Sequence, residues 1–250
     1  MEDSQEYKKK KSFFDSIITL YGRNVVLEVL QDPSIEIHKL HMSNSNKIDN
    51  TIKLINSLAK SRKVELVMHE KNSLARISKN SKQDQGVAID IIANSYKSTD
   101  EIKSMDKFKL IALDGIQNPQ NLGMIIRSCA AGFVDGIILP KKSSAKISPL
   151  VVKASAGTLF KLPIYYCNSL DEIFSSLKDT KIYSLDAKAD KDIYSIKAVD
   201  KAIYVLGNES DGVSHEVQKV CNDSISIPMN RGVESLNVAV TASLIAFMKN

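Results

Sequence analysis

Residues 108–139 read FKLIALDGIQNPQNLGMIIRSCAAGFVDGIIL, a stretch in which two apolar runs flank a turn and a helical pattern. The first run, 108–114, has the length and composition of a buried strand, and apolar residues at helical spacing predict a helix over 121–131. The second run, 136–139, completes a βαβ unit, whose two strands are parallel. In sheets of this kind, ligands bind at the carboxyl ends of the strands.

The same alternation of strands and helices continues on both sides of this unit. We predict further strands at residues 35–42, 64–68, 86–92, 164–167, 181–185, 202–206 and 224–227. We predict further helices at residues 16–30, 47–60, 71–78, 170–178, 214–219 and 236–248. This order is typical of an α/β protein with a mostly parallel sheet that helices cover on both faces.

The chain has 250 residues, which is enough for two small domains. Residues 94–107 are polar and lack a long apolar run, as is typical of a linker. We therefore predict a flexible N-terminal tail at 1–15, a small α/β domain at 16–94, a linker at 95–107 and a second α/β domain at 108–250.

Composition restricts the class of protein without identifying its function. The net charge of +5 permits a polyanionic partner but does not require one. The three cysteines are far apart, which favours a reducing, cytoplasmic compartment. The longest uncharged stretch, 235–248, is too short and too polar to cross a membrane.

Several common catalytic motifs are absent from the sequence. No two glycines are separated by a single residue, which excludes the glycine-rich dinucleotide fingerprint, and no P-loop is present. His38 and His41 are predicted to point to opposite faces of one strand, while His69 and His215 are isolated. We therefore predict no metal site.

Three turns hold polar residues at the edge of the sheet where a ligand is expected. They are residues 113–128, 204–212 and 225–240, and each follows or ends a predicted strand. The second turn offers a glycine, which allows close approach of backbone to a ligand, and a carboxylate two residues later. The third turn places uncharged backbone donors at the beginning of the last helix, where they favour a polar ligand.

The polar residues of these turns also have structural interpretations. Asn121 is a candidate helix cap, Glu209 a candidate solvated loop residue, and Ser235 and Asn237 are candidate N-caps of the last helix. Arg127 is different, because it follows two isoleucines on a helix that should pack on the sheet. An arginine so close to the core is expected to have an anionic partner.

Together the three turns resemble the signature motifs of the SpoU (TrmH) branch of the SPOUT methyltransferases. Residues 114–128 fit Asp-x-x-x-(Asn/Asp)-Pro-x-Asn-x-Gly-x-x-x-Arg-(Ser/Thr), and residues 207–212 fit Gly-x-Glu-x-x-Gly. Residues 227–240 fit Ile-Pro-Met-x-Gly-x-x-x-Ser-Leu-Asn-Val-(Ala/Ser)-Val. The departures are Gln120, where histidine is common, and one additional residue at 230–231.

The N-terminal segment resembles the small ribosomal-protein-like RNA-binding domain of the bacterial rRNA members of this family. The resemblance is carried by Gly22-x-x-x-Val26-x-x-x-Leu30 and by Gln85-Gly-Val87. It implies that residues 16–94 bind RNA.

The resemblance implies a C-terminal domain with a trefoil knot that binds S-adenosylmethionine, and a homodimer in which Arg127 reaches across the interface. The residues that match the polar, catalytic positions of the family are Asn121, Arg127, Glu209, Ser235 and Asn237. The residues that match its cofactor contacts are Leu206, Gly207, Ile227, Met229 and Leu236.

The implied reaction is methylation of a ribose 2′-hydroxyl in RNA. The two-domain layout favours a guanosine in 23S rRNA, in the peptidyl-transferase region. Two alternatives stay open: a tRNA 2′-O-methyltransferase, and a non-catalytic RNA-binding or ribosome-assembly protein.

Overall fold

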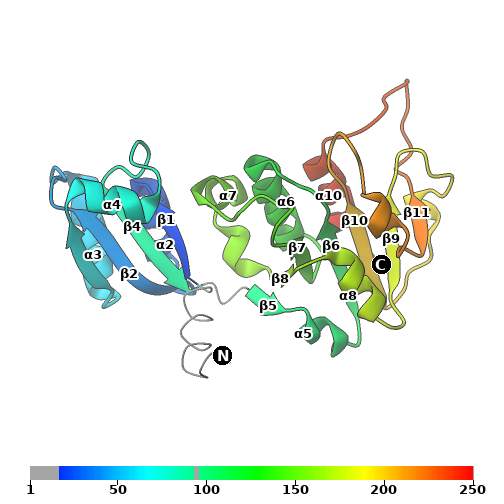
Figure 1. The fold of residues 1–250 in the computed structure, drawn as a ribbon, viewed down its shortest axis with the longest axis horizontal. Helices are drawn as coiled ribbons and strands as arrows, with labels where there is room; N and C mark the ends of the chain where they lie inside the picture. Colours follow the sequence, from blue (N-terminus) through cyan, green and yellow to red (C-terminus); the bar gives the residue numbers. More distant parts are fainter. Residues whose placement is uncertain (1–16, 93–95, 250) are drawn as a thin grey trace, which may run out of the picture. The chain divides into compact units, whose positions relative to one another are not determined.

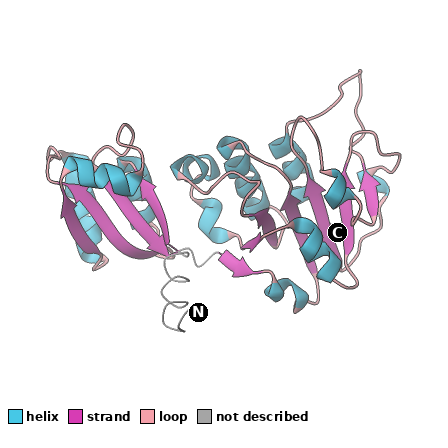
Figure 2. Ribbon diagram, viewed as in Figure 1, coloured by secondary structure: helices cyan, strands magenta, loops and turns pink. Residues whose placement is uncertain are grey.

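The structure is a computed structural model that describes residues 17–92 and 96–249 (Figure 1). The tail predicted at 1–15 lies outside the described residues. Contacts within the chain divide it into two compact units, one comprising 17–92 with 147–153 and the other 96–146 with 154–249. Both units are built from strands and helices (Figure 2).

The N-terminal unit contains a four-stranded sheet in the order β1-β4-β2-β3. Strand β4 is antiparallel to β1 and β2, and β2 is parallel to β3. The strands are β1 (Ile17–Tyr21), β2 (Glu36–Ser43), β3 (Glu65–His69) and β4 (Val87–Ile92), and the helices are α2 (Arg23–Gln31), α3 (Asn50–Ser61) and α4 (Lys71–Ser78).

The helix predicted over 16–30 is wrong in its first part, where the structure has strand β1. Leu20 is fully buried and lies opposite Ile89 of β4. Gly22 then separates β1 from α2 with a φ of 94°, a conformation that glycine adopts without strain. Apolar spacing ran through this glycine, so periodicity alone did not reveal the change from strand to helix.

The second unit contains a seven-stranded, fully parallel sheet in the order β11-β9-β10-β6-β7-β8-β5, which confirms the predicted α/β class with a mostly parallel sheet. Its strands are β5 (Tyr96–Ser98), β6 (Phe108–Leu113), β7 (Gly136–Pro140), β8 (Ile164–Cys167), β9 (Lys181–Leu185), β10 (Lys201–Leu206) and β11 (Asp223–Ile225). Its helices are α5 (Asp100–Lys103), α6 (Pro119–Ala131), α8 (Leu170–Ser176), α9 (His215–Gln218) and α10 (Val238–Phe247), with 3-10 turns at Thr158–Lys161 and Ile193–Ser195. Most of helix α7 (Pro149–Ser155) is assigned to the first unit.

Central strand β6 is buried along its whole length. Its one charged residue, Lys109, is only 2% exposed, and its Nζ donates a hydrogen bond to the carbonyl oxygen of Met248 at the end of α10. Burial lowers the pKa of Lys109, while the nearby carboxylate of Asp135 opposes that effect. The contact ties the last helix to the centre of the sheet.

The stretch predicted as a linker differs from that expectation, because it contains β5 and α5. Strand β5 pairs with β8 at the edge of the large sheet. A three-residue strand is too short to show the alternation by which strands are identified in a sequence. Among the described residues, no helix combines the length and apolar composition that crossing a membrane requires.

A chain of polar side chains crosses the small sheet. His41 is buried and bonds through Nδ1 to Nε2 of His69 at 3.0 Å and through Nε2 to Oδ2 of Asp90 at 3.1 Å. Thr19 donates to Oδ1 of Asp90 at 2.7 Å. The prediction that His69 is isolated is therefore wrong. Its partner, His41, was not recognised because it lies 28 residues away in the sequence. Within the described residues, no group of three potential ligands is arranged to hold a metal ion.

This polar chain predicts a pH-dependent stability. Burial and the neighbouring His41 lower the pKa of His69 below its ordinary 6.5, so the unfolded chain takes up this proton more readily. The stabilisation is therefore present above pH 6.5 and is lost as the pH falls through the lower pKa of the folded state. We expect the melting temperature, followed by circular dichroism, to fall between about pH 7.5 and about pH 5.5. His69→Gln should show a smaller fall, and an equal fall in both proteins would contradict this assignment.

Candidate active site

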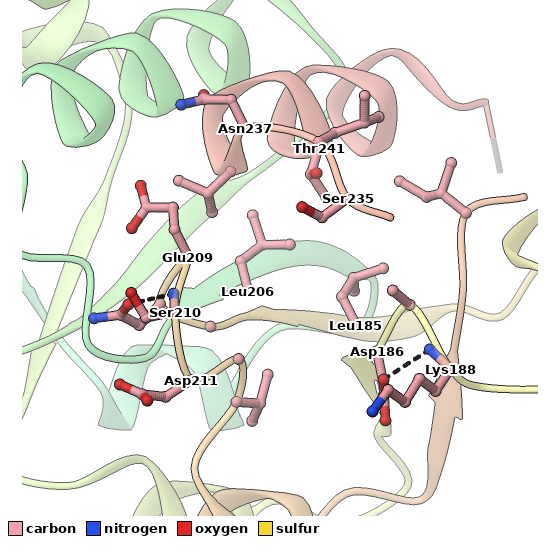
Figure 3. Close-up of a pocket in the computed structure, with 18 of the residues that line it drawn as sticks. Leu185, Asp186, Lys188, Leu206, Glu209, Ser210, Asp211, Ser235, Asn237 and Thr241 are labelled. Carbon is pink, nitrogen blue, oxygen red and sulfur yellow. Dashed lines mark hydrogen bonds between the residues drawn. The ribbon is translucent and has the colours of Figure 1, made fainter. Parts of the chain in front are cut away.

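A cavity of about 600 Å³ lies in the second unit, where the loops after β9, β10 and β11 meet the beginning of α10 (Figure 3). It is lined by residues 185–188, 206–213 and 235–238, with Gln218, Ile225, Ile227, Met229 and Thr241. This is the carboxyl edge of a parallel sheet, where ligands are expected.

The loop after β10 folds back tightly on itself. The amide of Asn208 donates to the carbonyl oxygen of Gly212 at 3.1 Å, and the amide of Gly212 donates to the carbonyl oxygen of Asn208 at 2.8 Å. A Cβ at Gly207 would lie 1.9 Å from the carbonyl carbon of Gly212 and 2.1 Å from the amide nitrogen of Val213. Because these neighbours are backbone atoms, only glycine fits at position 207.

The same loop is tied to the turn after β6. A carboxylate oxygen of Asp114 accepts a hydrogen bond from the amide of Ser214 at 2.7 Å. The side-chain amide of Asn208 donates to the carbonyl oxygen of Gly115 at 3.2 Å. These contacts fix the two turns relative to each other on neighbouring strands β6 and β10.

Side chains from all three turns meet at Asn121. This residue is only 9% exposed; its Nδ2 donates to Oε1 of Glu209, and its Oδ1 accepts a hydrogen bond from Nδ2 of Asn237 at 3.3 Å. Asn237 in turn caps α10, because its Oδ1 accepts from the amide of Ala239 at 2.9 Å. Each amide group has its orientation set by a partner on another turn.

The network settles two of the open interpretations. Asn118, and not Asn121, is the N-cap of α6, since its side chain accepts from the amides of Gln120 and Asn121. The capping interpretation of Asn121 is therefore wrong, and that of Asn237 is correct. Glu209 is exposed, and its second carboxylate oxygen has no hydrogen-bond partner among the described residues.

Eight of the ten residues identified from the motifs line the cavity: Leu206, Gly207, Glu209, Ile227, Met229, Ser235, Leu236 and Asn237. Asn121 lies beside it, hydrogen-bonded to two of them. Arg127 does not line it.

Arg127 is exposed, and its guanidinium has no partner within the described part of the chain. The expectation of a position close to the core is therefore wrong for the single chain. Ile125 and Ile126 are buried on one side of α6, whereas Met124 and Arg127, three residues apart, face the solvent on the other.

The motifs did not identify the loop after β9, which contributes Leu185, Asp186 and Lys188 to the cavity. A carboxylate oxygen of Asp186 accepts from the amide of Lys188 at 2.9 Å, which shapes the loop (Figure 3). Thr241, one turn into α10 from Asn237, was also missed. The signal for the loop was present, because β9 was itself predicted and the carboxyl-end rule applies to it as well.

Comparison with known families matches two models. The SpoU rRNA Methylase family model matches residues 108–247, and the RNA 2′-O ribose methyltransferase substrate binding model matches residues 19–97.

Whole-length relatives are also found. A Staphylococcus saprophyticus protein whose name is that of a TrmH family tRNA/rRNA methyltransferase is 32% identical over 242 residues, 92% of this chain and 94% of the relative. The AdoMet complex of the SpoU methyltransferase AviRb from Streptomyces viridochromogenes has a TM-score of 0.72 at 20% identity, covering 98% of this chain and 91% of that one. An AdoMet-bound rRNA methyltransferase from Sinorhizobium meliloti has a TM-score of 0.68 at 20% identity, covering 95% and 88%.

Proposed function

The chain belongs to the SpoU rRNA methylase family, and on that premise we propose that it methylates a ribose 2′-hydroxyl of RNA with S-adenosylmethionine as the methyl donor. The observation that carries the proposal is the hydrogen-bonded group Asn121, Glu209 and Asn237 beside the cavity of the second unit. It joins the three turns that hold the family's motifs.

The residues around this cavity fit S-adenosylmethionine. A volume of about 600 Å³ lies in the range of small-molecule sites. Leu206, Ile227 and Leu236 offer apolar contacts for the adenosine, and the narrow loop at Gly207 exposes backbone polar groups. When bound there, S-adenosylmethionine supplies a methyl group activated by a sulfonium sulfur.

The chain's own residues must align a weak nucleophile. A 2′-hydroxyl gains reactivity when it is held in line with the methyl group and its proton is partly withdrawn. The unpartnered oxygen of Glu209 and the hydroxyl of Ser235 are suitable hydrogen-bond partners for the ribose. Asn121 is a positioning residue, because its hydrogen bond to one oxygen of Glu209 sets the orientation of that carboxylate.

We further propose that the second unit forms a homodimer through α6 and α10. These helices pack on each other, with Ser128 and Ser243 hydroxyls 2.7 Å apart. Their outer side carries exposed apolar residues: Met124 at 47%, Val240 at 44%, Leu244 at 40% and Phe247 at 55% exposure. Such residues favour burial against a second copy.

In this dimer, Arg127 lies on the covered side of α6 and reaches the active site of the partner subunit. Guanidinium stays protonated at ordinary pH, so a role as general base is unsuitable. We propose instead that it binds the phosphate next to the target ribose and stabilises the developing alkoxide. We also propose the family's trefoil knot for this unit, which the closeness of the loops after β9, β10 and β11 supports.

For the substrate, we propose a guanosine of 23S rRNA, with residues 16–94 as the RNA-binding domain and 108–250 as the catalytic domain. A tRNA is the second candidate, favoured by a relative whose name includes both RNA classes. The intact group Asn121, Glu209 and Asn237 supports catalysis over a purely RNA-binding role.

The test is incubation of the protein with labelled S-adenosylmethionine and separate pools of unmodified rRNA and tRNA, followed by alkaline hydrolysis. Methylation at the 2′-oxygen blocks hydrolysis at that nucleotide, so label in alkali-resistant dinucleotides from rRNA is the expected result. Label only from tRNA would select the second candidate. No label in either pool would favour the non-catalytic alternative.

Asn121→Asp provides a test of the positioning role. The new carboxylate lies beside Glu209, removes the hydrogen-bond donor and introduces repulsion, so the Glu209 side chain is expected to move. We expect kcat to fall by about 100-fold with little change in affinity for S-adenosylmethionine. Gln120→Glu, an exposed neighbour on the same helix, adds the same charge and should change kcat by less than about twofold. Equal losses in the two variants would contradict the role.

A further inference from the structure

A second cavity, of about 570 Å³, lies entirely within the N-terminal unit. It opens where the loops before α2, after β2 and before β4 come together. Its lining includes Arg23, Ser45, Asn46, Lys71, Lys82 and Gln85. None of these residues takes part in the active site described above.

The oxygens of Asp84, those of Gln85 and the carbonyl oxygen of Gly86 already accept hydrogen bonds within the protein. Asp84 is only 7% exposed, and its two carboxylate oxygens accept from the hydroxyl of Ser78 and the amide of Gly86, each at 2.9 Å. The backbone oxygen of Gln85 accepts from Nε of Arg23 at 3.2 Å, and its side-chain oxygen accepts from the amide of Arg23 at 3.2 Å. The carbonyl oxygen of Gly86 is occupied by Nδ2 of Asn46 at 2.7 Å.

The basic side chains of the cavity still have donors without a partner among the described residues. Lys71 and Lys82 are exposed and have no carboxylate partner among the described residues. Arg23 pairs with Asp49 through one terminal nitrogen, while its other terminal nitrogen makes no hydrogen bond within the described chain. The cavity is therefore positive and rich in donors, which suits an anionic ligand with several acceptor oxygens.

The wall beside these donors has an unusual backbone geometry. Gln85 and Gly86 have φ values of 52° and 78°, and a Cβ at Gly86 would lie 1.9 Å from Oδ1 of Asn46. A non-glycine residue in the left-handed region is costly, and such strain is concentrated at functional sites. The side chain of Gln85 is held against the beginning of α2 by its hydrogen bond from the amide of Arg23.

We propose that this cavity binds one nucleotide of single-stranded RNA, with its phosphate at Arg23, Lys71 and Lys82. The volume is that of a small-molecule site and is much larger than a phosphate group requires, which leaves room for ribose and base. This inference rests on the proposed function, because it places a specific contact with the RNA substrate away from the methyl-transfer site.

The test measures binding of the full chain to a fluorescein-labelled single-stranded RNA of about ten nucleotides by anisotropy over a range of salt concentrations. Each lost phosphate contact lowers the slope of log affinity against log salt by about 0.7. Because these two lysines contact the same phosphate, we expect Lys71→Gln/Lys82→Gln to lower the slope by about 0.7 and to weaken binding by about tenfold at low salt.

The matched control is Lys53→Gln/Lys60→Gln, which removes two exposed lysines of α3 that do not line the cavity. For this control, the slope of log affinity against log salt should equal that of the unchanged protein within experimental error. Equal slopes in the two double variants would overturn the proposal, because the contribution of the lysines would then be a general surface effect.

A second pair of variants tests the cavity without changing charge. Ser45→Leu places a larger side chain at the exposed lining position 45, whereas Asn44→Leu makes a similar change at an exposed position outside the cavity. Only Ser45→Leu should weaken RNA binding, and equal binding by both would also overturn the proposal. S-adenosylmethionine affinity, measured by calorimetry, should be the same in every variant. Failure of methyl transfer therefore stays distinguishable from failure of this RNA site.

Discussion

Gly207→Val is expected to abolish the binding of S-adenosylmethionine, with a loss of at least about 100-fold in affinity, or about 2.8 kcal/mol. Even a single Cβ at this position would lie within 2.1 Å of three backbone atoms of Gly212 and Val213. The valine forces the loop after β10 to open, and this loop forms one wall of the cavity. Titration calorimetry of the full chain measures the effect.

Ser214→Ala is the control for this variant, because Ser214 directly follows the same loop, does not line the cavity, and its hydroxyl makes no hydrogen bond within the described residues. Its affinity for S-adenosylmethionine should change by less than about threefold. Gly207→Ala provides a milder form of the same clash, and circular dichroism checks that each variant is folded. A folded Gly207→Val protein with undiminished affinity would show that the cofactor binds elsewhere.

Arg127→Ala is expected to leave cofactor affinity within about twofold and to lower kcat by about 100-fold to 1,000-fold, the usual effect of removing a donor that stabilises developing charge. The guanidinium is exposed in the single chain and has no partner among the described residues, so its loss should not disturb the fold. Single-turnover methylation of RNA measures the rate, and calorimetry measures the affinity. Loss of S-adenosylmethionine binding would contradict the assigned role.

Arg76→Ala is the matched control, because Arg76 is also an exposed helical arginine without a partner in the described chain. Its kcat at saturating RNA should be unchanged. Mixing two inactive proteins, Arg127→Ala and Gly207→Val, tests whether Arg127 acts across the proposed dimer. A mixed dimer of Arg127→Ala and Gly207→Val chains has one site with an intact cavity and an arginine from its partner. Random mixing then restores about a quarter of the activity, whereas an arginine acting within its own chain restores none.

Most of the candidate site was predictable because its residues follow strands that are identifiable from local composition. Leu206 and Ile227 were placed at strand ends from apolar runs, and both line the cavity. The hydrogen bonds of Asn121 were not predictable, since its partners Glu209 and Asn237 are 88 and 116 residues away. The spacing of residues within one motif does not indicate which of its side chains form hydrogen bonds with the side chains of another motif.

Local spacing was sufficient to establish the α/β class, the three turns and the resemblance to a methyltransferase family. Strand and helix periodicities arise between residues close in the chain, so they are visible without a structure. Other features depended on contacts between distant segments. These include strand β1, the pairing of His41 with His69, and the donor-rich cavity around Lys82.

The position of Arg127 also depended on those contacts. Its neighbours Ile125 and Ile126 indicated a helix against the sheet, but which side of that helix faces the sheet is set by the packing of α6 with α10 and the strands. Burial and hydrogen-bond partners are properties of the assembled fold, because each requires groups that only folding brings together.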